Sequence, residues 1–463
     1  MDDLIRHLTD IVTAEHVLTG DAIDEAYSHD EVLTVEPHAP EVVIRPETSE
    51  QVSQALRLAN DAGIPVTARG SGTGLSGACV PSHGGIVLSL ERMNRIVEID
   101  TENHVAVVEP GVTLAELDEA TREKGLIYPI FPGESSASLG GNIATNAGGM
   151  RAVKYGVTRH QVMGLEAVLA DGRIIQTGGK LVKISSGYDL TQLIVGSEGT
   201  LAVVTKIIIK LLPRLEHRAT LLAAFESVPE VTQAVPKLVA TGVGPLMVEY
   251  IDKLTMVGMT RYRGIELAID EVVQEKALAY LLVVVEGRSA ERVEGDVEDL
   301  GQLCLDMGAL EVFVMPATAA DELIEARERT FWVGKEAGLS DIIDVVVPRA
   351  EIPRYMEKVR LIAQEHSTLI SGCGHAGDGN IHLGVFKPDP EERSTIVREL
   401  LKAAVDAGGA VSAEHGIGKA KKHYFRELGD PTTIELMKSI KQAFDPKGIL
   451  NPGTIFDRED QGR

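Results

Sequence analysis

The sequence predicts an α+β protein with more than one domain, and three observations support this. A chain of 463 residues exceeds one typical domain, and 44% of its residues are hydrophobic, enough for two large cores. Short β-rich segments alternate with helical segments along the chain. The 46 glycines stand against only 4% aromatic residues, which indicates many tight turns and backbone that can approach a bound molecule closely.

The N-terminal part of the chain is predicted to mix helices with strands. The expected elements are an amphipathic N-terminal helix, strands at residues 42–45 and 64–69, a helix over residues 49–62, and a buried strand within residues 199–212. Pro213 ends that last strand because it has no backbone N–H to pair. We therefore place a domain boundary near residue 215.

The rest of the chain predicts a second α+β domain and a helical C-terminal part. The expected elements are strands at residues 279–285 and 343–347, and helices over residues 289–307 and 431–444. Glycines, histidines and acidic residues concentrate at residues 372–384 and 408–418, which makes these segments candidates for a functional site. The predicted division of the chain is residues 1–215, 216–415 and 416–463.

Charge and cysteine content exclude several classes of function. The formal net charge of −24, from 69 acidic and 45 basic side chains, would repel nucleic acid and an anionic membrane surface. The three cysteines, Cys79, Cys304 and Cys373, form no CxxC pair, which suits a reducing cytoplasm and argues against an iron–sulfur cluster. No apolar run reaches the roughly 18 residues of a membrane span. We expect a cytoplasmic protein without a membrane span and without a nucleic-acid partner.

The first glycine block, residues 69–77, contains the pattern GxGxxG at Gly72, Gly74 and Gly77, directly after a predicted strand. A Rossmann dinucleotide site would need a helix to begin there, but Pro81 and the glycine pair at 84–85 interrupt any helix. Glycine-rich backbone can instead form a nest of N–H groups that binds a pyrophosphate. An ordinary turn, the alternative, would need fewer glycines.

The second glycine block, residues 131–149, is dominated by small side chains. Such backbone can approach a flat ring system closely, while Asn142, Thr145 and Asn146 offer hydrogen-bond donors and acceptors to the edges of the ring. A purely structural loop is the alternative interpretation.

Both blocks, together with Gly196-Ser-Glu-Gly-Thr-Leu201, resemble the vanillyl-alcohol oxidase and p-cresol methylhydroxylase superfamily of flavoproteins. The resemblance covers about residues 40–215. It implies a two-part FAD-binding domain of the p-cresol methylhydroxylase type, an α+β cap domain with an antiparallel sheet, and a C-terminal segment that returns to the FAD domain. The FAD contacts that it implies are Arg69, Gly70, Ser71, Gly72, Thr73, Gly74, Leu75, Ser76, Pro132, Gly133, Ser138, Leu139, Gly140, Asn142, Thr145, Asn146, Gly149, Tyr155, Glu198, Gly199 and Asn451. Some members attach the flavin through a His or Cys of the first loop; here Ser71, Thr73 and Ser76 stand there, so we expect non-covalent FAD.

The second candidate site is the segment Gly372-Cys-Gly-His-Ala-Gly-Asp-Gly-Asn-Ile-His382, with Ser412-Ala-Glu-His-Gly416 further on. Two histidines and a carboxylate can bind a divalent metal and leave coordination positions open. His375 and His382 are separated by a glycine turn and do not have helical spacing, so their spacing alone does not show that they converge. Structural histidines remain the alternative.

These segments resemble the metal-dependent D-2-hydroxy acid branch of the superfamily, which includes D-lactate dehydrogenase, D-2-hydroxyglutarate dehydrogenase and the FAD subunit of glycolate oxidase. The resemblance implies that His375, His382 and Glu414 bind zinc or manganese, that Asn380 is a polar group on the substrate side, and that His415 is the catalytic base. In the implied reaction the metal binds the hydroxyl group, His415 removes its proton, and hydride passes to the flavin.

The substrate carboxylate needs a cation, and the family's substrate arginine falls on Arg327 or Arg329, of which we favour Arg327. A solvated helical face is the alternative for this Glu- and Arg-rich segment. Ile342 stands where some members have a lysine, which favours a small acid such as D-lactate or glycolate over a dicarboxylate. Electrons would then leave to an external quinone, cytochrome or electron-transfer flavoprotein.

Three alternatives remain open from the sequence. The first is a D-2-hydroxyglutarate dehydrogenase, and the second is an oxidase that returns electrons to oxygen. The third is a FAD-binding subunit of a multi-subunit glycolate oxidase complex. A homodimer and partner subunits are both compatible with the sequence.

Overall fold

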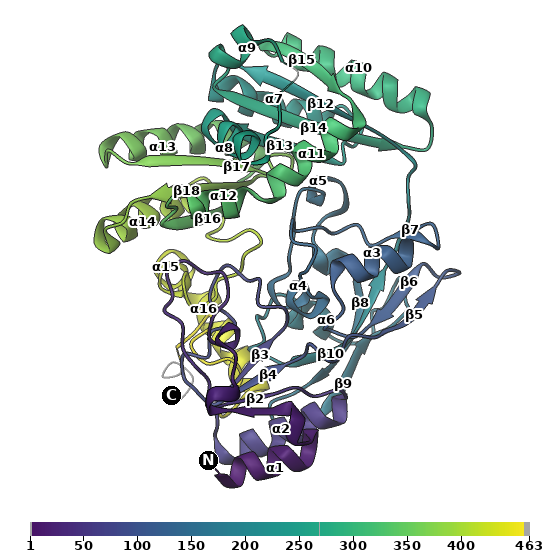
Figure 1. Ribbon diagram of the computed structural model, residues 1–463, viewed down its shortest axis with the longest axis vertical. Coiled ribbons are helices and arrows are strands. Elements are labelled where there is room, and N and C mark those ends of the chain that lie inside the picture. The colour runs from purple at the N-terminus through teal and green to yellow at the C-terminus, as the bar shows by residue number, and fades with distance from the viewer. Residues whose placement is uncertain (1, 268, 458–463) are drawn as a thin grey trace.

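The structure, a computed structural model, describes residues 2–267 and 269–457. Figure 1 shows a large sheet with its helices in the upper half of the view and two smaller sheets in the lower half. The last part of the chain, in yellow, lies largely with the lower half, near the N-terminal elements. The fold is α+β, which confirms the fold class that the sequence predicts.

The first small sheet has four strands in the order β1-β2-β4-β3. Strands β2, β4 and β3 are parallel and β1 is antiparallel to β2. Thr48 begins helix α2 because its hydroxyl accepts the N–H of Gln51, and Gly63 ends it in the left-handed conformation. The elements of this unit are β1 (Val17–Thr19), β2 (Val42–Ile44), β3 (Val66–Arg69), β4 (Ile86–Ser89), α1 (Asp2–Val12) and α2 (Ser49–Ala62).

The second small sheet is antiparallel, with five strands in the order β5-β6-β10-β8-β9. Its core also receives Leu117 from α3 and Ile143 from α4. The elements of this unit are β5 (Ile96–Asp100), β6 (Val105–Val108), β8 (Val162–Val168), β9 (Ile174–Gly178), β10 (Val203–Lys210), α3 (Leu114–Arg122), α4 (Leu139–Thr145), α5 (Ala152–Tyr155), α6 (Leu190–Ile194), and the paired β7 (Leu126–Ile127) and β11 (Leu212–Pro213).

The large sheet is antiparallel throughout and has seven strands in the order β15-β12-β14-β13-β17-β18-β16. Its strands are β12 (His217–Phe225), β13 (Met247–Asp252), β14 (Ala279–Gly287), β15 (Ala309–Met315), β16 (Asp341–Val346), β17 (Leu369–Gly374) and β18 (Asn380–Phe386). Residues 280–285 of β14 alternate between two cores on opposite faces of the sheet. Because helices cover both faces, this strand is apolar along nearly its whole length.

Helices α7, α10, α13 and α14 contribute to the core on one face of the large sheet, and α8 and α11 to the core on the other. The helices of this half are α7 (Val228–Ala240), α8 (Lys253–Arg263), α9 (Glu271–Lys276), α10 (Ala290–Asp306), α11 (Ala317–Glu328), α12 (Thr330–Glu336), α13 (Ile352–Glu365) and α14 (Pro390–Asp406). None of the helices within the described residues combines the length and apolar character needed to cross a bilayer.

The C-terminal segment packs against the first small sheet. After α15 (Lys422–Leu428) and α16 (Pro431–Phe444), the chain runs beside the end of β3, where Leu450 forms a parallel bridge with Val66. Asn451 donates its backbone N–H to Val66 O at 2.8 Å. The last described part of the chain is thereby fixed to the unit that carries the first glycine block.

Candidate active site

The first glycine block forms an irregular loop along one wall of a cavity. Residues 70–85, all described, contain turns and no helix, which agrees with the rejection of a Rossmann site. Within the described structure, the backbone N–H groups of residues 72–76 donate to no protein acceptor. Gly72 has φ 75°, a conformation that favours glycine. A run of unpartnered N–H groups beside a cavity fits the pyrophosphate of FAD.

The second glycine block forms the facing wall through α4, a helix that the sequence analysis does not predict. Glycine, asparagine and threonine have low helix propensity, but Ser138 caps the helix by accepting the N–H of Gly141 at 3.3 Å. Ser71 N–H donates to Ser138 Oγ at 3.3 Å, and Ser138 N–H donates to Ser71 Oγ at 2.9 Å. A Cβ on Gly70 would lie 2.2 Å from Ser138 Oγ, so these two walls meet too closely for a side chain there.

Most of the residues expected at FAD line this first cavity. They are residues 69–76, Pro132, Ser138, Gly140, Asn142, Thr145, Glu198, Gly199 and Asn451. The others lie elsewhere: Leu139 is fully buried in the core, Asn146 ends α4 and accepts the N–H of Arg159, and Tyr155 bonds to Glu286. Gly149 packs against the backbone of Phe131, and Gly133 lines the second cavity, described below.

Two residues that the sequence analysis does not single out as FAD contacts, Asp30 and Cys79, also line the first cavity. Burial, reinforced by the nearby Asp30 carboxylate, raises the pKa of the Cys79 thiol to about 11. The thiol therefore stays protonated at neutral pH, where it is a poor nucleophile. This supports the expectation of non-covalent FAD.

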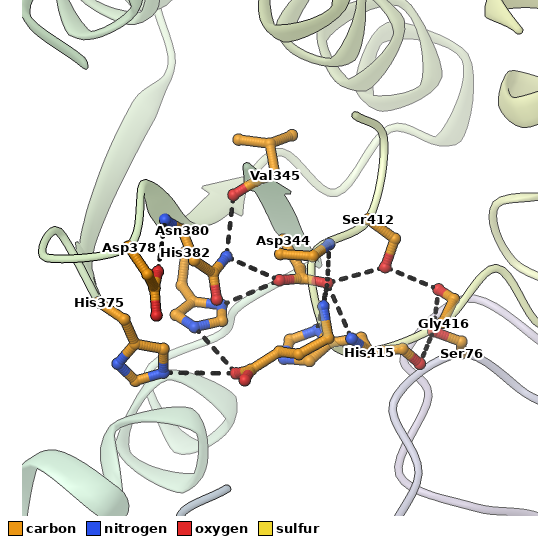
Figure 2. A network of polar contacts seen from close by, with 12 residues as sticks. Ser76, Asp344, Val345, His375, Asp378, Asn380, His382, Ser412, His415 and Gly416 are labelled. Carbon is orange, nitrogen blue, oxygen red and sulfur yellow. Dashed lines mark hydrogen bonds and ion pairs between the residues drawn. The ribbon is translucent and has the colours of Figure 1, made fainter. Parts of the chain in front are cut away.

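The predicted metal ligands converge on the large sheet. Strands β17 and β18 form a hairpin in which Cys373 pairs with His382, and His375 lies in the turn that joins them. The hairpin places the rings of His375 and His382 with centroids 5.0 Å apart. Figure 2 shows these two histidines, and Glu414 lies close to the Nε2 atom of each ring.

The atoms that converge have the spacing of a metal site. Glu414 Oε1 lies 3.4 Å from His375 Nε2 and 3.3 Å from His382 Nε2. A tetrahedral ion with bonds of about 2.0–2.1 Å keeps its ligand atoms roughly 3.3–3.4 Å apart. The set His375, His382 and Glu414 therefore fits a divalent ion such as zinc or manganese.

Glu249 on β13 joins this cluster to Arg327, and the sequence analysis does not identify it. Its fully buried carboxylate lies 2.7 Å from His375 Nδ1 and 2.9 Å from Arg327 Nη2. Burial alone would lower the pKa of His375, but the carboxylates of Glu249 and Glu414 raise it to about 10. The same negative field favours any cation at this point, and a carboxylate behind a ligating histidine fixes the orientation of its ring.

Arg327 lies in the wall of a second cavity, and Arg329 does not. Arg327 is 7% exposed, and its Nε and Nη2 atoms lack a well-formed hydrogen bond even though Nη2 lies near Glu249. Arg329 is exposed at the end of α11. A buried guanidinium with donors to spare beside the cluster is available for a carboxylate ligand.

Asp344 on β16 is a second supporting residue that the sequence analysis does not identify. Its carboxylate accepts several hydrogen bonds. Its Oδ2 accepts the hydroxyl of Ser412 at 2.8 Å and three successive backbone N–H groups, from residues 413–415, at 2.9–3.1 Å (Figure 2). Asp344, His382, Glu414 and His415 also bring one potential ligand atom each within 4.8 Å. Because the carboxylate of Asp344 already accepts these donors, we assign it to positioning the 412–415 turn and not to metal binding.

Asn380 is not placed as the sequence analysis expects. Its Nδ2 donates to Asp344 Oδ1 at 2.9 Å and to Val345 O at 2.8 Å. Asn380 lines neither of the two cavities. The amide therefore supports Asp344, and its expected place beside the substrate is corrected to a place behind the site.

His415 lies where the two cavities meet. Together with Glu414, Leu75 and Pro132 it lines both of them. Its ring stacks on that of His382, with centroids 5.1 Å apart. Burial, with a smaller contribution from Lys421 and His382 and against the effect of Asp344, lowers the pKa of His415 to about 4. The imidazole is therefore neutral near pH 7 and able to accept a proton.

This fold, with a glycine-rich cavity beside a cap sheet that carries a His–His–Glu cluster, defines a flavin-dependent oxidoreductase. Residues 40–178 match the FAD binding domain family, and residues 214–455 match the C-terminal domain of FAD linked oxidases. The chain belongs to this family of FAD-linked oxidoreductases.

Relatives of the chain extend over almost its whole length. An uncharacterized FAD-linked oxidoreductase of Mycobacterium tuberculosis is 50% identical, with 98% of this chain and 99% of the relative covered. A D-lactate dehydrogenase of Archaeoglobus fulgidus is 41% identical, with 93% and 95% covered. The solved structure of p-cresol methylhydroxylase has a TM-score of 0.81 at 19% identity over 99% of this chain and 97% of that one, which confirms the predicted fold type.

Proposed function

We propose that this protein oxidises a D-2-hydroxy acid to the 2-oxo acid, with non-covalent FAD and a divalent metal. The observation that carries the proposal is the position of His415 and Glu414 at the junction of the two cavities. A base and a metal ligand there lie between the space that suits the flavin and the space that suits the substrate. The similarity to D-lactate dehydrogenases supports the choice of substrate class.

Each side chain has a defined task in this proposal. Arg327 binds the substrate carboxylate through its spare donors. His375, His382 and Glu414 hold the metal, which when bound polarises the hydroxyl group and lowers its pKa. His415, neutral at pH 7, takes the hydroxyl proton as the bond between carbon and oxygen becomes double. FAD held in the first cavity would supply the acceptor for the hydride from the α-carbon.

Glu249 and Asp344 act through other residues. Glu249 orients both Arg327 and His375, so the carboxylate-binding group and one metal ligand are held by the same buried carboxylate. Asp344 fixes the turn that presents Glu414 and His415. Because the base must be within hydrogen-bond reach of the proton that it removes, the rigidity of this turn matters for turnover.

The sequence favours a small acid, D-lactate or glycolate, over D-2-hydroxyglutarate because Ile342 offers no cation for a second carboxylate. A quinone, a cytochrome or an electron-transfer flavoprotein would reoxidise the flavin. A FAD-binding subunit without activity would have no need for the convergent set His375, His382, Glu414 and His415, which favours an enzyme.

A dye-linked assay of the purified protein, loaded with FAD and with zinc or manganese, tests the proposal. The panel contains the D and L forms of lactate, 2-hydroxyglutarate and malate, together with glycolate. Dye reduction by D-acids and not by their L forms is expected. Equal rates for both forms, or no reduction by any acid while FAD is bound, would contradict it.

A further inference from the structure

The second cavity extends well beyond the metal cluster. Its volume is about 440 Å³, within the range of roughly 300–1,000 Å³ that is typical of sites for drug-sized ligands. The polar end carries Arg327, His375, His382, Glu414 and His415. The methyl group of lactate would leave most of the remaining wall uncovered.

That remaining wall is apolar and comes from three parts of the cap. Helix α8 contributes one side, α12 and the residues after it contribute a second, and strands β16, β17 and β18 contribute the third. The large apolar side chains on these elements are Leu254, Val257, Phe331, Val333, Leu339, Ile342, Leu369 and Phe386.

Several of these side chains are exposed. Leu254 is 50% exposed, Val257 41% and Leu369 46%. A group of exposed apolar side chains around a cavity marks a binding surface, because the contact of apolar side chains with water is unfavourable. An apolar ligand extending outward from the metal cluster would cover them.

Few charges are available to a polar ligand in this wall. Away from the polar end that carries Arg327 and the metal cluster, the charged residues that line the cavity are Arg261 and Glu328. Arg261 is exposed, so its attraction for a distal carboxylate is screened by solvent. Burial raises the pKa of Glu328 to about 7, and this carboxyl, neutral or ionised, offers no positive charge to a second carboxylate. The chemistry of the wall therefore disfavours a dicarboxylate.

We propose that the substrate is a D-2-hydroxy acid whose side chain is a medium-length alkyl or an aromatic group, bound along the wall formed by α8, α12 and strands β16, β17 and β18. This inference rests on the proposed function and specifies its substrate. Arg327 and the metal cluster hold the carboxylate and hydroxyl, and the apolar wall holds the tail. The acid is thus larger than the lactate or glycolate that Ile342 alone suggests.

A series of acids of increasing length tests the inference. The dye-linked assay compares D-lactate, D-2-hydroxybutanoate, D-2-hydroxyhexanoate, D-2-hydroxyoctanoate and D-phenyllactate with D-2-hydroxyglutarate. Each buried methylene contributes about 0.8 kcal/mol, so kcat/KM should rise by up to roughly fourfold per methylene until the wall is covered. D-2-hydroxyglutarate should fall below D-2-hydroxyhexanoate.

A substitution in the wall gives a second readout. Gly258 lies within α8, and a Cβ there would meet only Val333 Cγ1, at an ordinary 3.6 Å. Gly258→Leu should fill part of the cavity and lower the ratio of kcat/KM for D-2-hydroxyoctanoate to that for D-lactate by roughly tenfold. Gly295→Leu, in α10, is the matched control because a Cβ there meets nothing within 4 Å, and it should leave the ratio unchanged.

The outcomes separate this inference from the proposed function. If no acid reduces the dye, both fail. If D-lactate is oxidised but kcat/KM is independent of chain length, or D-2-hydroxyglutarate is preferred, only the inference on the tail is overturned. If Gly258→Leu instead raises the KM of a quinone acceptor and leaves the acid ratio unchanged, the apolar wall serves the acceptor and the inference is also overturned.

Discussion

The two cavities are built in different ways. The first is formed largely by backbone and small side chains from short stretches of sequence, chiefly within residues 69–76, 132–147 and 197–204. The second brings together charged groups from strands, a helix and turns that are far apart in sequence: Glu249, Arg327, Asp344, His375 and Glu414. A cofactor cradle can therefore be built from short motifs, whereas the catalytic cluster depends on the tertiary fold.

This difference predicts that changes at the second site should alter turnover without altering FAD content. His415→Ala removes the proposed base at the junction of the cavities and should lower turnover by about 10²–10⁴-fold. The absorbance spectrum of the purified variant should show wild-type FAD content. Near-wild-type turnover of a D-2-hydroxy acid would exclude His415 as the base.

A smaller effect is expected from a substitution of Asp344, because its carboxylate positions the turn that carries Glu414 and does not itself react. Asp344→Asn should weaken metal binding by about 10–100-fold, because an amide nitrogen would face the N–H groups of residues 413–415. Competition with a chromogenic chelator measures this affinity directly. Asp341→Asn is the matched control on the same strand, since Asp341 accepts only the N–H of Ile342. Unchanged metal affinity in Asp344→Asn would contradict the positioning role.

Substitutions in the glycine loop of the first cavity should instead weaken the binding of FAD. Gly72→Val forces a β-branched residue into φ 75°, and strain of about 1–3 kcal/mol should weaken FAD binding by roughly tenfold. Titration of the apoprotein with FAD measures the change. Gly63→Val carries similar strain at φ 67° at the end of α2, outside the lining of the first cavity, and should lower stability without affecting FAD affinity. Equal FAD affinity in the Gly72 variant and the wild type would contradict the proposed anion nest.

The difference between local motifs and tertiary contacts also explains which elements the sequence predicts well. The helices over residues 49–62 and 431–444 follow from caps and periodicity and have those bounds in the structure. Helix α4 is missed because its two glycines, its asparagine and its threonine have low helix propensity, although Ser138 is a recognisable cap. Leu139 and Tyr155 are expected at FAD, yet their side chains face the protein core and Glu286.

At the second site the sequence predicts the residues proposed to react but not the residues that support them. His375, His382, Glu414 and His415 belong to glycine-rich motifs that resemble a known branch of flavoproteins. Glu249 and Asp344 lie in apolar strands whose patterns predict only a buried sheet, and their partners are far away in sequence. Asn380 is in the motif, but its amide turns to Asp344 because β16 and β18 are neighbours.

The most direct test of the central claim is anaerobic reduction of the bound flavin by a D-2-hydroxy acid in metal-loaded and metal-depleted protein. The account predicts that the D-acid bleaches the flavin of the metal-loaded protein and its L form does not. Chelation should abolish the bleaching while FAD stays bound, and zinc or manganese should restore it. Bleaching that persists at the same rate after complete metal removal would contradict the roles proposed for His375, His382 and Glu414.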